Sequence, residues 1–236
     1  HHIACLAAFL EPVARDGLMI EIYSSDPRSG SVAPFGGIRP LFTPNPMAIG
    51  IPTSTEPILI DISASITTNG LSSRLHAAGQ KGENAWWLDA SGRPTKDPAV
   101  LFAKPPGSIL PLGGLDAGHK GYGLALLIET FTSALSGRGR SQPAEGWGAT
   151  VLLRLTDPAA FGGDDAFKTE TDWLIKACHD NPPRAEGRPV RLPGERGLKL
   201  RREQLSRGVA LHPSILPALA PWAARYTLAL PEPVAS

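Results

Sequence analysis

The strongest constraint on the fold is the alternation of apolar runs and helix-periodic segments along the chain. Short apolar runs typical of strands alternate with stretches in which apolar residues recur every three or four positions. Because the two kinds of segment alternate, the sequence predicts an α/β protein. The predicted strands span 18–23, 57–63 and 149–156, and the predicted helices span 6–13, 122–135 and 164–179, with short helical pieces in about the last forty residues.

Glycine and proline mark the ends of several of these segments. Gly17 and Gly137 stand where the first and second helices are expected to stop, and Pro12 predicts a kink or an early end of the first. The stretch "ASGRPT" predicts a hairpin turn just after Trp86, Trp87 and Leu88. The stretch "FTPNPMAIGIPT" is rich in proline and glycine and is expected to be a connection.

The most informative short stretch is "PLGGLDAGHKGYGLALLIETFTSAL", residues 111–135. Five glycines expose backbone amides and lead into the predicted helix, whose N-terminus favours an anion. Lys120 adds a positive charge there, so the segment suits a phosphate or diphosphate. A flexible glycine loop with a solvated lysine explains the same residues, and the sequence leaves both interpretations open.

Two common nucleotide signatures do not occur. The chain contains neither G-x-G-x-x-G after a first strand nor G-x-x-x-x-G-K-[ST]. A dinucleotide would therefore bind to a fold other than Rossmann. Asp61, at the end of "PILID", could accept hydrogen bonds from ribose hydroxyls, or it could simply cap the next turn.

Composition argues against several classes of partner. The 236 residues include 23 basic and 22 acidic side chains, a net charge of +1, which predicts no binding to nucleic acid or to an anionic membrane surface. Apolar runs stay below the roughly 20 residues of a membrane span. Two cysteines, Cys5 and Cys178, are too few for a secreted disulfide framework, so we expect a cytoplasmic protein. The six histidines show no metal-binding spacing, and we expect no metal.

Successive blocks of the chain resemble one known family. The blocks are "HIACLAAF", "SSDP", "VAPFGG", "FTPNPMAIGIP", "ILIDIS", "GRPTKDP", "LPLGG" with "HKGYGLAL", "RLTDPAAF" and "LPGER". In this order they resemble the type-2 malate/L-lactate dehydrogenase family, which includes ureidoglycolate and sulfolactate dehydrogenases and delta-1-piperideine-2-carboxylate reductase. The resemblance runs from His2 to about Gly208.

The resemblance implies an activity and a fold. Such proteins are NAD(P)-dependent oxidoreductases that interconvert a 2-hydroxy acid and a 2-oxo acid, or reduce a cyclic imine. The implied fold is an α/β, non-Rossmann NAD(P)-binding fold of the malate/L-lactate dehydrogenase type, with a mixed sheet and flanking helices. The implied cofactor is NAD or NADP, the substrate is a small molecule, and the assembly is a homodimer.

The resemblance also assigns residues. The block "HIA" matches that of the family's catalytic histidine, which makes His2 the general acid/base; Ala4 stands where the family usually has glycine. Histidine suits this role because it exchanges protons near neutral pH. The implied cofactor contacts are Ser25, Asp61, Ile62, Ser63, His119, Lys120, Gly121, Pro193, Gly194 and Glu195.

One difference from the family bears on function. Its members carry an N-terminal helical segment of roughly a hundred residues, the size of a small domain, which holds the substrate and which this sequence lacks. We therefore expect residues 1–236 to form the NAD(P)-binding and catalytic portion, with a cofactor-binding core at 25–150. The alternative is a catalytically incomplete fragment that only binds the nucleotide.

Overall fold

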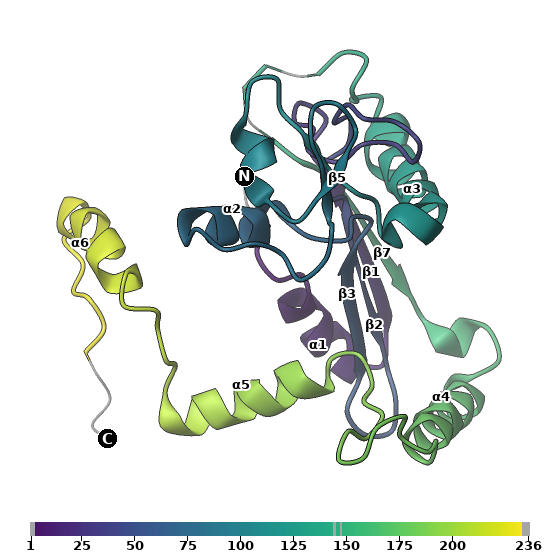
Figure 1. Cartoon of the computed structure of the whole chain (residues 1–236). Helices are drawn as coiled ribbons and strands as arrows, with labels where there is room; N and C mark the ends of the chain where they lie inside the picture. The colour runs from purple at the N-terminus through teal and green to yellow at the C-terminus, as the bar shows by residue number, and fades with distance from the viewer. Residues whose placement is uncertain (1–2, 144, 147, 233–236) are drawn as a thin grey trace. The chain divides into compact units, whose positions relative to one another are not determined.

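A computed structural model describes residues 3–143, 145–146 and 148–232. The chain divides into two compact units, 1–193 and 194–236. The first unit contains both sheets, and the second contains helices α5 (Glu195–Arg207) and α6 (Ile215–Arg225) (Figure 1). The short helical pieces predicted for the C-terminal part are confirmed.

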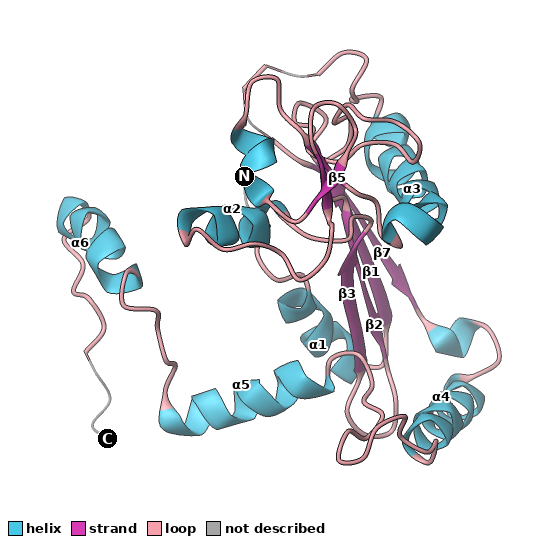
Figure 2. Cartoon of the chain, in the orientation of Figure 1, coloured by secondary structure: helices cyan, strands magenta, loops and turns pink. Residues whose placement is uncertain are grey.

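The main sheet of the first unit has four strands in the order β3-β2-β1-β7. They are β1 (Met19–Ser25), β2 (Pro46–Ile51), β3 (Ile58–Ser63) and β7 (Thr150–Thr156) (Figure 2). All their pairings are antiparallel. A parallel contact occurs as an isolated bridge between Val32 and Ile109. The three predicted strands are confirmed as β1, β3 and β7.

Strand β2 corrects the expectation that residues 42–53 form only a connection. Pro46 is the first residue of β2, where the missing backbone N–H of proline is tolerated. The apolar run from Met47 to Ile51 then pairs with β1 and β3 on its two sides. Prolines at both ends of a segment are local signals of a loop, so the sequence pattern did not indicate a strand here.

Each face of the sheet carries a helix. Helix α1 (Ala7–Arg15) packs against β2 on one face, where a Cβ added at Gly50 would lie 3.1 Å from the Leu10 Cβ. The helix stops before Gly17, at φ +86°, as predicted. It does not end early at Pro12, which lies inside the helix. On the other face lies the π-helical segment η2 (Thr130–Ala134), which contains Phe131. The rings of Tyr23 and Phe131 pack edge to face there, with their centroids 5.2 Å apart.

A smaller sheet has the order β5-β4-β6. Strands β4 (Trp87–Leu88) and β5 (Pro94–Thr95) form the predicted hairpin, and β6 (Ser108–Ile109) pairs with β4 on its other side. Trp87 is fully buried, and its indole N–H donates to Ser72 Oγ at 3.1 Å. A short 3-10 turn, η1 (Pro98–Phe102), follows β5.

Ser72 belongs to α2 (Asn69–Ala77), a helix that the sequence did not predict. The segment has no apolar stripe, so periodicity gave no signal. Thr68 caps the helix, because its Oγ1 accepts from the Leu71 N–H at 3.1 Å. The cap and the packing of Ser72 against Trp87 stabilise this helix.

Helix α3 (Gly114–Glu129) corrects the expected glycine loop. The helix begins at Gly114 instead of residue 122, so the glycines from 118 to 123 are helical. Ala117, at φ −124° and ψ 17°, marks a kink inside it. Beyond Glu129 the helix continues as a π-helical segment, η2 (Thr130–Ala134), and the chain turns at Gly137, at φ +67°, where a stop was predicted.

The rest of the first unit follows the prediction. After β7 come a 3-10 turn, η3 (Pro158–Ala160), and α4 (Asp164–His179), the third predicted helix. Within the described part of the chain, no helix combines the length and apolarity of a membrane span.

Two glycines of α3 test this correction. A Cβ added at Gly121 would lie 2.3 Å from the Leu112 nitrogen and 2.7 Å from the Ala64 oxygen, whereas one added at Gly123 would meet no atom within 4 Å. We expect Gly121→Ala to lower the free energy of unfolding by about 3 kcal/mol. Gly123→Ala should raise it by about 0.5–1 kcal/mol, since alanine favours helix.

Urea unfolding of both variants, followed by circular dichroism, checks this pair. In a flexible loop both substitutions would have the same small effect, so equal unfolding energies for the two variants would contradict the close packing of α3.

A polar cluster lies on the face of the sheet that α3 covers. Tyr23 Oη donates to Glu21 Oε2 at 2.6 Å, and Arg154 Nε donates to Glu21 Oε1 at 3.1 Å. Burial opposes ionisation of Glu21, but the hydrogen bonds from Arg154 and Tyr23 lower its pKa overall. Burial and the hydrogen bond to Glu21 raise the pKa of Tyr23 to about 12, from an ordinary value of 10.0.

The raised pKa of Tyr23 predicts a loss of stability in alkali. Between pH 10 and about 12 the folded chain keeps a phenol proton that the unfolded chain has lost. The free energy of unfolding should therefore fall as the pH rises through this window. Tyr23→Phe should flatten that fall in urea unfolding at a series of pH values. An unchanged slope in Tyr23→Phe, equal to that of the exposed control Tyr226→Phe, would rule out the assignment.

Candidate active site

A cleft of about 650 Å³ opens at one end of the main sheet. Its volume lies within the range of small-molecule and cofactor sites, roughly 300–1,000 Å³. The described lining comes from the start of the chain, the ends of β1 and β3, the loop before β2, the first turn of α2 and the residue before β7. The lining residues are Ile3, Ala4, Ser24, Ser25, Asp26, Ser29, Thr43, Pro44, Pro46, Asp61, Ile62, Ser63, Thr68, Asn69, Gly70 and Ala149.

This cleft brings together predicted residues that are far apart in the sequence. Ser25 ends β1, while Asp61, Ile62 and Ser63 end β3, and all four line the cleft. His2 lies outside the residues that the structure describes. Ile3 and Ala4, which follow it, line the cleft.

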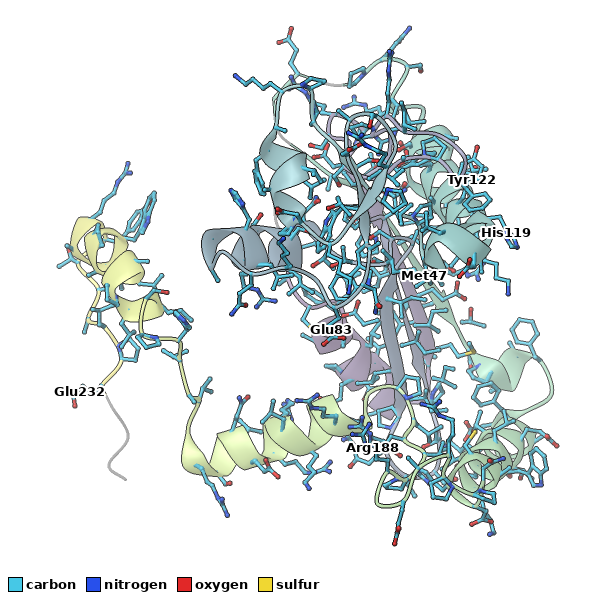
Figure 3. The ribbon with its side chains drawn as sticks, viewed as in Figure 1. Met47, Glu83, His119, Tyr122, Arg188 and Glu232 are labelled. Atoms are coloured by element: carbon cyan, nitrogen blue, oxygen red, sulfur yellow. The ribbon has the colours of Figure 1, made fainter. Side chains whose placement is uncertain are left out.

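The other predicted contacts do not line this cleft. His119 and Lys120 are exposed on α3, and Figure 3 labels His119 on this helix. The imidazole of His119 packs edge to face on Phe35, with the ring centroids 5.8 Å apart. Gly121 is buried, and its N–H donates to the Leu112 carbonyl at 3.1 Å. These three follow the kink at Ala117, in the early turns of the second part of α3.

The block at 193–195 lies across the boundary between the two units. Pro193 is the last residue of the first unit, and its carbonyl accepts from the Leu59 N–H at 3.1 Å. Gly194 precedes α5 at φ +95°, and Glu195 is the first residue of that helix.

The hydroxyl of Ser25 is fully engaged within the protein. Its Oγ lies 2.7 Å from Thr132 Oγ1, 3.1 Å from Ser133 Oγ and 2.9 Å from Thr150 Oγ1. A hydroxyl has one donor and two acceptor positions, so three partners use its whole capacity. Ser25 therefore has only its backbone to offer a ligand. Its hydroxyl instead ties β1 to β7 and to the π-helical segment η2.

The hydroxyl of Ser24 differs from that of Ser25 in its hydrogen bonding. Successive strand residues point to opposite faces, so Ser24 lies on the same face of the sheet as Ile22. Ile22 is opposite Ala48 on β2, and Ala48 is opposite Asp61 on β3, so Ser24 and Asp61 share this face. Ser24 is 3% exposed, and its hydroxyl makes no hydrogen bond within the described residues. The sequence analysis missed it, although strand periodicity over 18–25 could have separated the two serines.

Asp61 caps a helix. Its Oδ2 accepts from the Ala7 N–H at 2.9 Å, at the start of α1, and lies 3.5 Å from Cys5 Sγ. Capping was one of the two interpretations of this aspartate, but the capped helix precedes it in sequence instead of following it. Within the described residues Oδ1 accepts no hydrogen bond, so Asp61 keeps one oxygen for a ligand in the cleft.

Asn45 fixes the loop before β2. It is fully buried, with φ +46°, and stands between the lining residues Pro44 and Pro46. Thr43 Oγ1 donates to its Oδ1 at 2.6 Å, and its Nδ2 donates to Glu129 Oε1 at 2.9 Å. The side chain thus holds a left-handed backbone that is rare outside glycine. The "NP" dipeptide signalled a turn, but nothing in the sequence pointed to its buried partner on α3.

Arg140 completes this connection. Its Nη2 donates to Glu129 Oε1 at 2.6 Å, and its Nη1 donates to the carbonyl of Ser29, which lines the cleft, at 2.6 Å. Both side chains of the ion pair are largely buried. Helix α3 is thereby linked to two segments of the cleft wall.

Comparison with known proteins identifies the family. The sequence profile described as "Malate/L-lactate dehydrogenase" matches residues 1–220. The chain belongs to the malate/L-lactate dehydrogenase family. The resemblance seen in the sequence blocks is thus confirmed over nearly the whole chain.

Individual relatives agree with this assignment. The chain is 37% identical over 213 residues to a (2R)-3-sulfolactate dehydrogenase (NADP(+)) from Chromohalobacter salexigens, covering 86% of this chain and 59% of the relative. It is 29% identical over 223 residues to a Delta(1)-pyrroline-2-carboxylate reductase from Ancylobacter novellus, covering 89% and 61%. The chain thus spans about three fifths of the length of these curated relatives.

A solved dehydrogenase from Sinorhizobium meliloti has the same fold. The two structures superpose with a TM-score of 0.79 at 31% sequence identity, over 94% of this chain and 64% of the other. The predicted fold class, an α/β fold of the malate/L-lactate dehydrogenase type with flanking helices, is confirmed. The expected mixed sheet is corrected, because the named strands pair only antiparallel.

Ala4 shows why glycine suits the position two residues after His2. Its φ is +60°, in the left-handed region that costs an alanine about 1–2 kcal/mol. We expect Ala4→Gly to raise the free energy of unfolding by about 0.5–1 kcal/mol, because the relief of strain exceeds the added chain entropy.

Thermal and urea unfolding check this expectation. Ala8→Gly is the matched control, since Ala8 is exposed within α1 and glycine there should destabilise by about 0.5–1 kcal/mol. Equal losses in the two variants would show that Ala4 is not strained.

Proposed function

We propose that this protein is an NAD(P)-dependent oxidoreductase that interconverts a 2-hydroxy acid and a 2-oxo acid. The observation that carries the proposal is the cleft, which is lined by Ser25, residues 61–63, Ile3 and Ala4. Ile3 and Ala4 follow His2 directly in the sequence. Membership of the family and relatives named as dehydrogenases support it.

His2 is the general acid/base in this proposal. Reduction of a 2-oxo acid produces an alkoxide, to which the imidazole donates a proton; oxidation of the 2-hydroxy acid needs the hydroxyl proton removed by the same group. Histidine serves both directions because it titrates near neutral pH. The nicotinamide, when bound, supplies or accepts the hydride.

The cofactor, NAD or NADP, would lie in the cleft. The space is large enough for part or all of a dinucleotide. Asp61 offers the unused carboxylate oxygen to a ribose hydroxyl, Ile62 an apolar side chain that is 40% exposed, and Ser25 its backbone. Roles for His119, Lys120, Gly121 and residues 193–195 remain part of the proposal and rest on the resemblance alone.

Two alternatives remain in the proposal. The relative named a Delta(1)-pyrroline-2-carboxylate reductase favours reduction of a cyclic imine, such as piperideine-2-carboxylate, in the same cleft. The other alternative is a portion that binds the nucleotide without turnover. A cofactor-binding core at 25–150, a homodimer and a cytoplasmic location complete the proposal.

Binding and turnover measurements test the function. We expect NADH or NADPH to bind, measured by fluorescence titration, and one member of a panel of 2-oxo acids and cyclic imines to oxidise the nucleotide, followed by absorbance. Failure to bind either nucleotide would reject the proposal. Binding without turnover on any substrate would favour the nucleotide-binding alternative.

A pair of histidine variants tests the acid/base. His2→Ala should lower kcat by about a hundredfold or more, the usual contribution of a positioned acid/base, with little change in the Kd for NADH. His1→Ala is the matched control and should keep full turnover. Full turnover in His2→Ala would remove the assigned role.

A further inference from the structure

We propose that the first turn of α2, together with Ser24, forms an anion subsite that holds the diphosphate of the dinucleotide. The choice of diphosphate rests on the proposed function, whereas the anion subsite rests on the geometry of the cleft. This subsite is distinct from the glycine-rich stretch of α3, which the sequence favoured for the same task.

The start of α2 offers two backbone donors to the cleft. Thr68, Asn69 and Gly70 all line it. Thr68 binds the N–H groups of the two residues that follow Gly70. Its Oγ1 accepts from the Leu71 N–H, and its carbonyl accepts from the Ser72 N–H at 3.0 Å. The N–H groups of Asn69 and Gly70 make no hydrogen bond within the described residues. These are the orphan donors of a helix N-terminus, to which an anion binds.

Both residues that carry these donors border the cleft. Outside its chain neighbours and its own helix backbone, a Cβ added at Gly70 would have only Thr68 Oγ1 within 4 Å, at 3.9 Å. The side-chain side of Gly70 is therefore open.

Ser24 is a second polar group of the same cleft. Its side chain is almost fully buried and lines the cleft, and its hydroxyl makes no hydrogen bond to a described residue. The hydroxyl can therefore donate a hydrogen bond to a ligand oxygen in the cleft. Ser24 and Ser63 lie on the same face of the sheet, since Ser63 stands two residues after Asp61 on β3.

A chain of hydroxyl hydrogen bonds fixes α2 beside that row. Ser63 Oγ donates to the Ser65 carbonyl at 3.0 Å, and Ser65 Oγ donates to the Thr67 carbonyl at 2.6 Å. The loop between β3 and α2 is thereby held in one conformation. The segment that leads from β3 to the two amides of α2 is therefore ordered before any ligand binds.

A negative group in this cleft depends on uncharged donors. The described lining contains two carboxylates, Asp26 and Asp61, and no lysine, arginine or histidine. Carboxylates accept hydrogen bonds from ribose hydroxyls and repel phosphate, so a diphosphate would need backbone or hydroxyl donors. Among the described lining, the helix N-terminus and the Ser24 hydroxyl are the donors best suited to a negative group.

Proline at position 69 removes one donor with little other change. Asn69 is the first residue of α2, where proline is favoured because its missing N–H is not needed by the helix. Thr68, at φ −105° and ψ 158°, already has the extended backbone that a following proline requires. Asn69→Ala is the matched control, since it removes the side chain and keeps the N–H.

Calorimetry with inorganic pyrophosphate and fluorescence titration with NADH and NADPH provide the readouts. We expect Asn69→Pro to raise the Kd of both kinds of ligand by about tenfold, the value of one hydrogen bond to a charged group, while Asn69→Ala stays within about twofold of wild type. Ser24→Ala should also raise the Kd by about tenfold. Thr132→Ala, which removes a partner of the Ser25 hydroxyl outside the cleft lining, should lower the unfolding temperature with less effect on Kd.

The outcomes separate this inference from the proposed function. Wild-type affinity for pyrophosphate in both Asn69→Pro and Ser24→Ala, or no binding of pyrophosphate to the wild type, would overturn the subsite. Nucleotide binding that ignores both substitutions would leave the proposed function standing and the subsite refuted. Pyrophosphate binding that depends on Asn69 and Ser24, without binding of NADH or NADPH, would support the subsite and reject the function. If the substitutions weaken only a 2-oxo acid such as pyruvate, the assignment to the diphosphate is wrong.

Discussion

The register of β1 between β2 and β7 determines how the cleft is built. The strand is hydrogen-bonded on both sides and buried from Ile20 to Ser25, so a shift by one residue would turn each of its side chains to the opposite face. With the register observed, Ser24 faces the cleft and Ser25 faces the hydroxyls of η2 and β7. The two adjacent serines thus differ in their tasks: in our proposal Ser24 binds a ligand, whereas the Ser25 hydroxyl stabilises the fold.

Helix α3 acts on the cleft from behind the sheet. Its residue Glu129 bonds to Asn45 and Arg140, which hold the loop before β2 and the segment at Ser29. Glu129 is largely buried, so these hydrogen bonds form where water competes little and where loss of a partner is costly. The position of the cleft wall therefore depends on residues that do not themselves belong to the cleft lining.

The glycine-rich stretch of α3 illustrates two uses of glycine. The sequence suggested backbone amides open to a phosphate. In the structure Gly121 allows α3 to approach Leu112 and Ala64, and its N–H is occupied by a protein carbonyl. Open amides occur instead at α2, where the helix begins in the cleft and Thr68 leaves two N–H groups without a partner among the described residues. Glycine content alone therefore does not decide which helix start offers open amides to an anion.

The sequence by itself determined the local elements and the family. The apolar runs of β1, β3 and β7 and the periodicity of α1 and α4 are local properties, and the ordered blocks are themselves typical of the family. Tertiary structure decided the rest. Strand β2 exists because two neighbouring strands pair with it, and α2 because Thr68 caps it and Trp87 packs on Ser72. The split between Ser24 and Ser25 likewise depends on strand pairing and on a helix more than a hundred residues away in sequence. Such long-range contacts leave little trace in local sequence, which is why the cleft's donors became visible only in three dimensions.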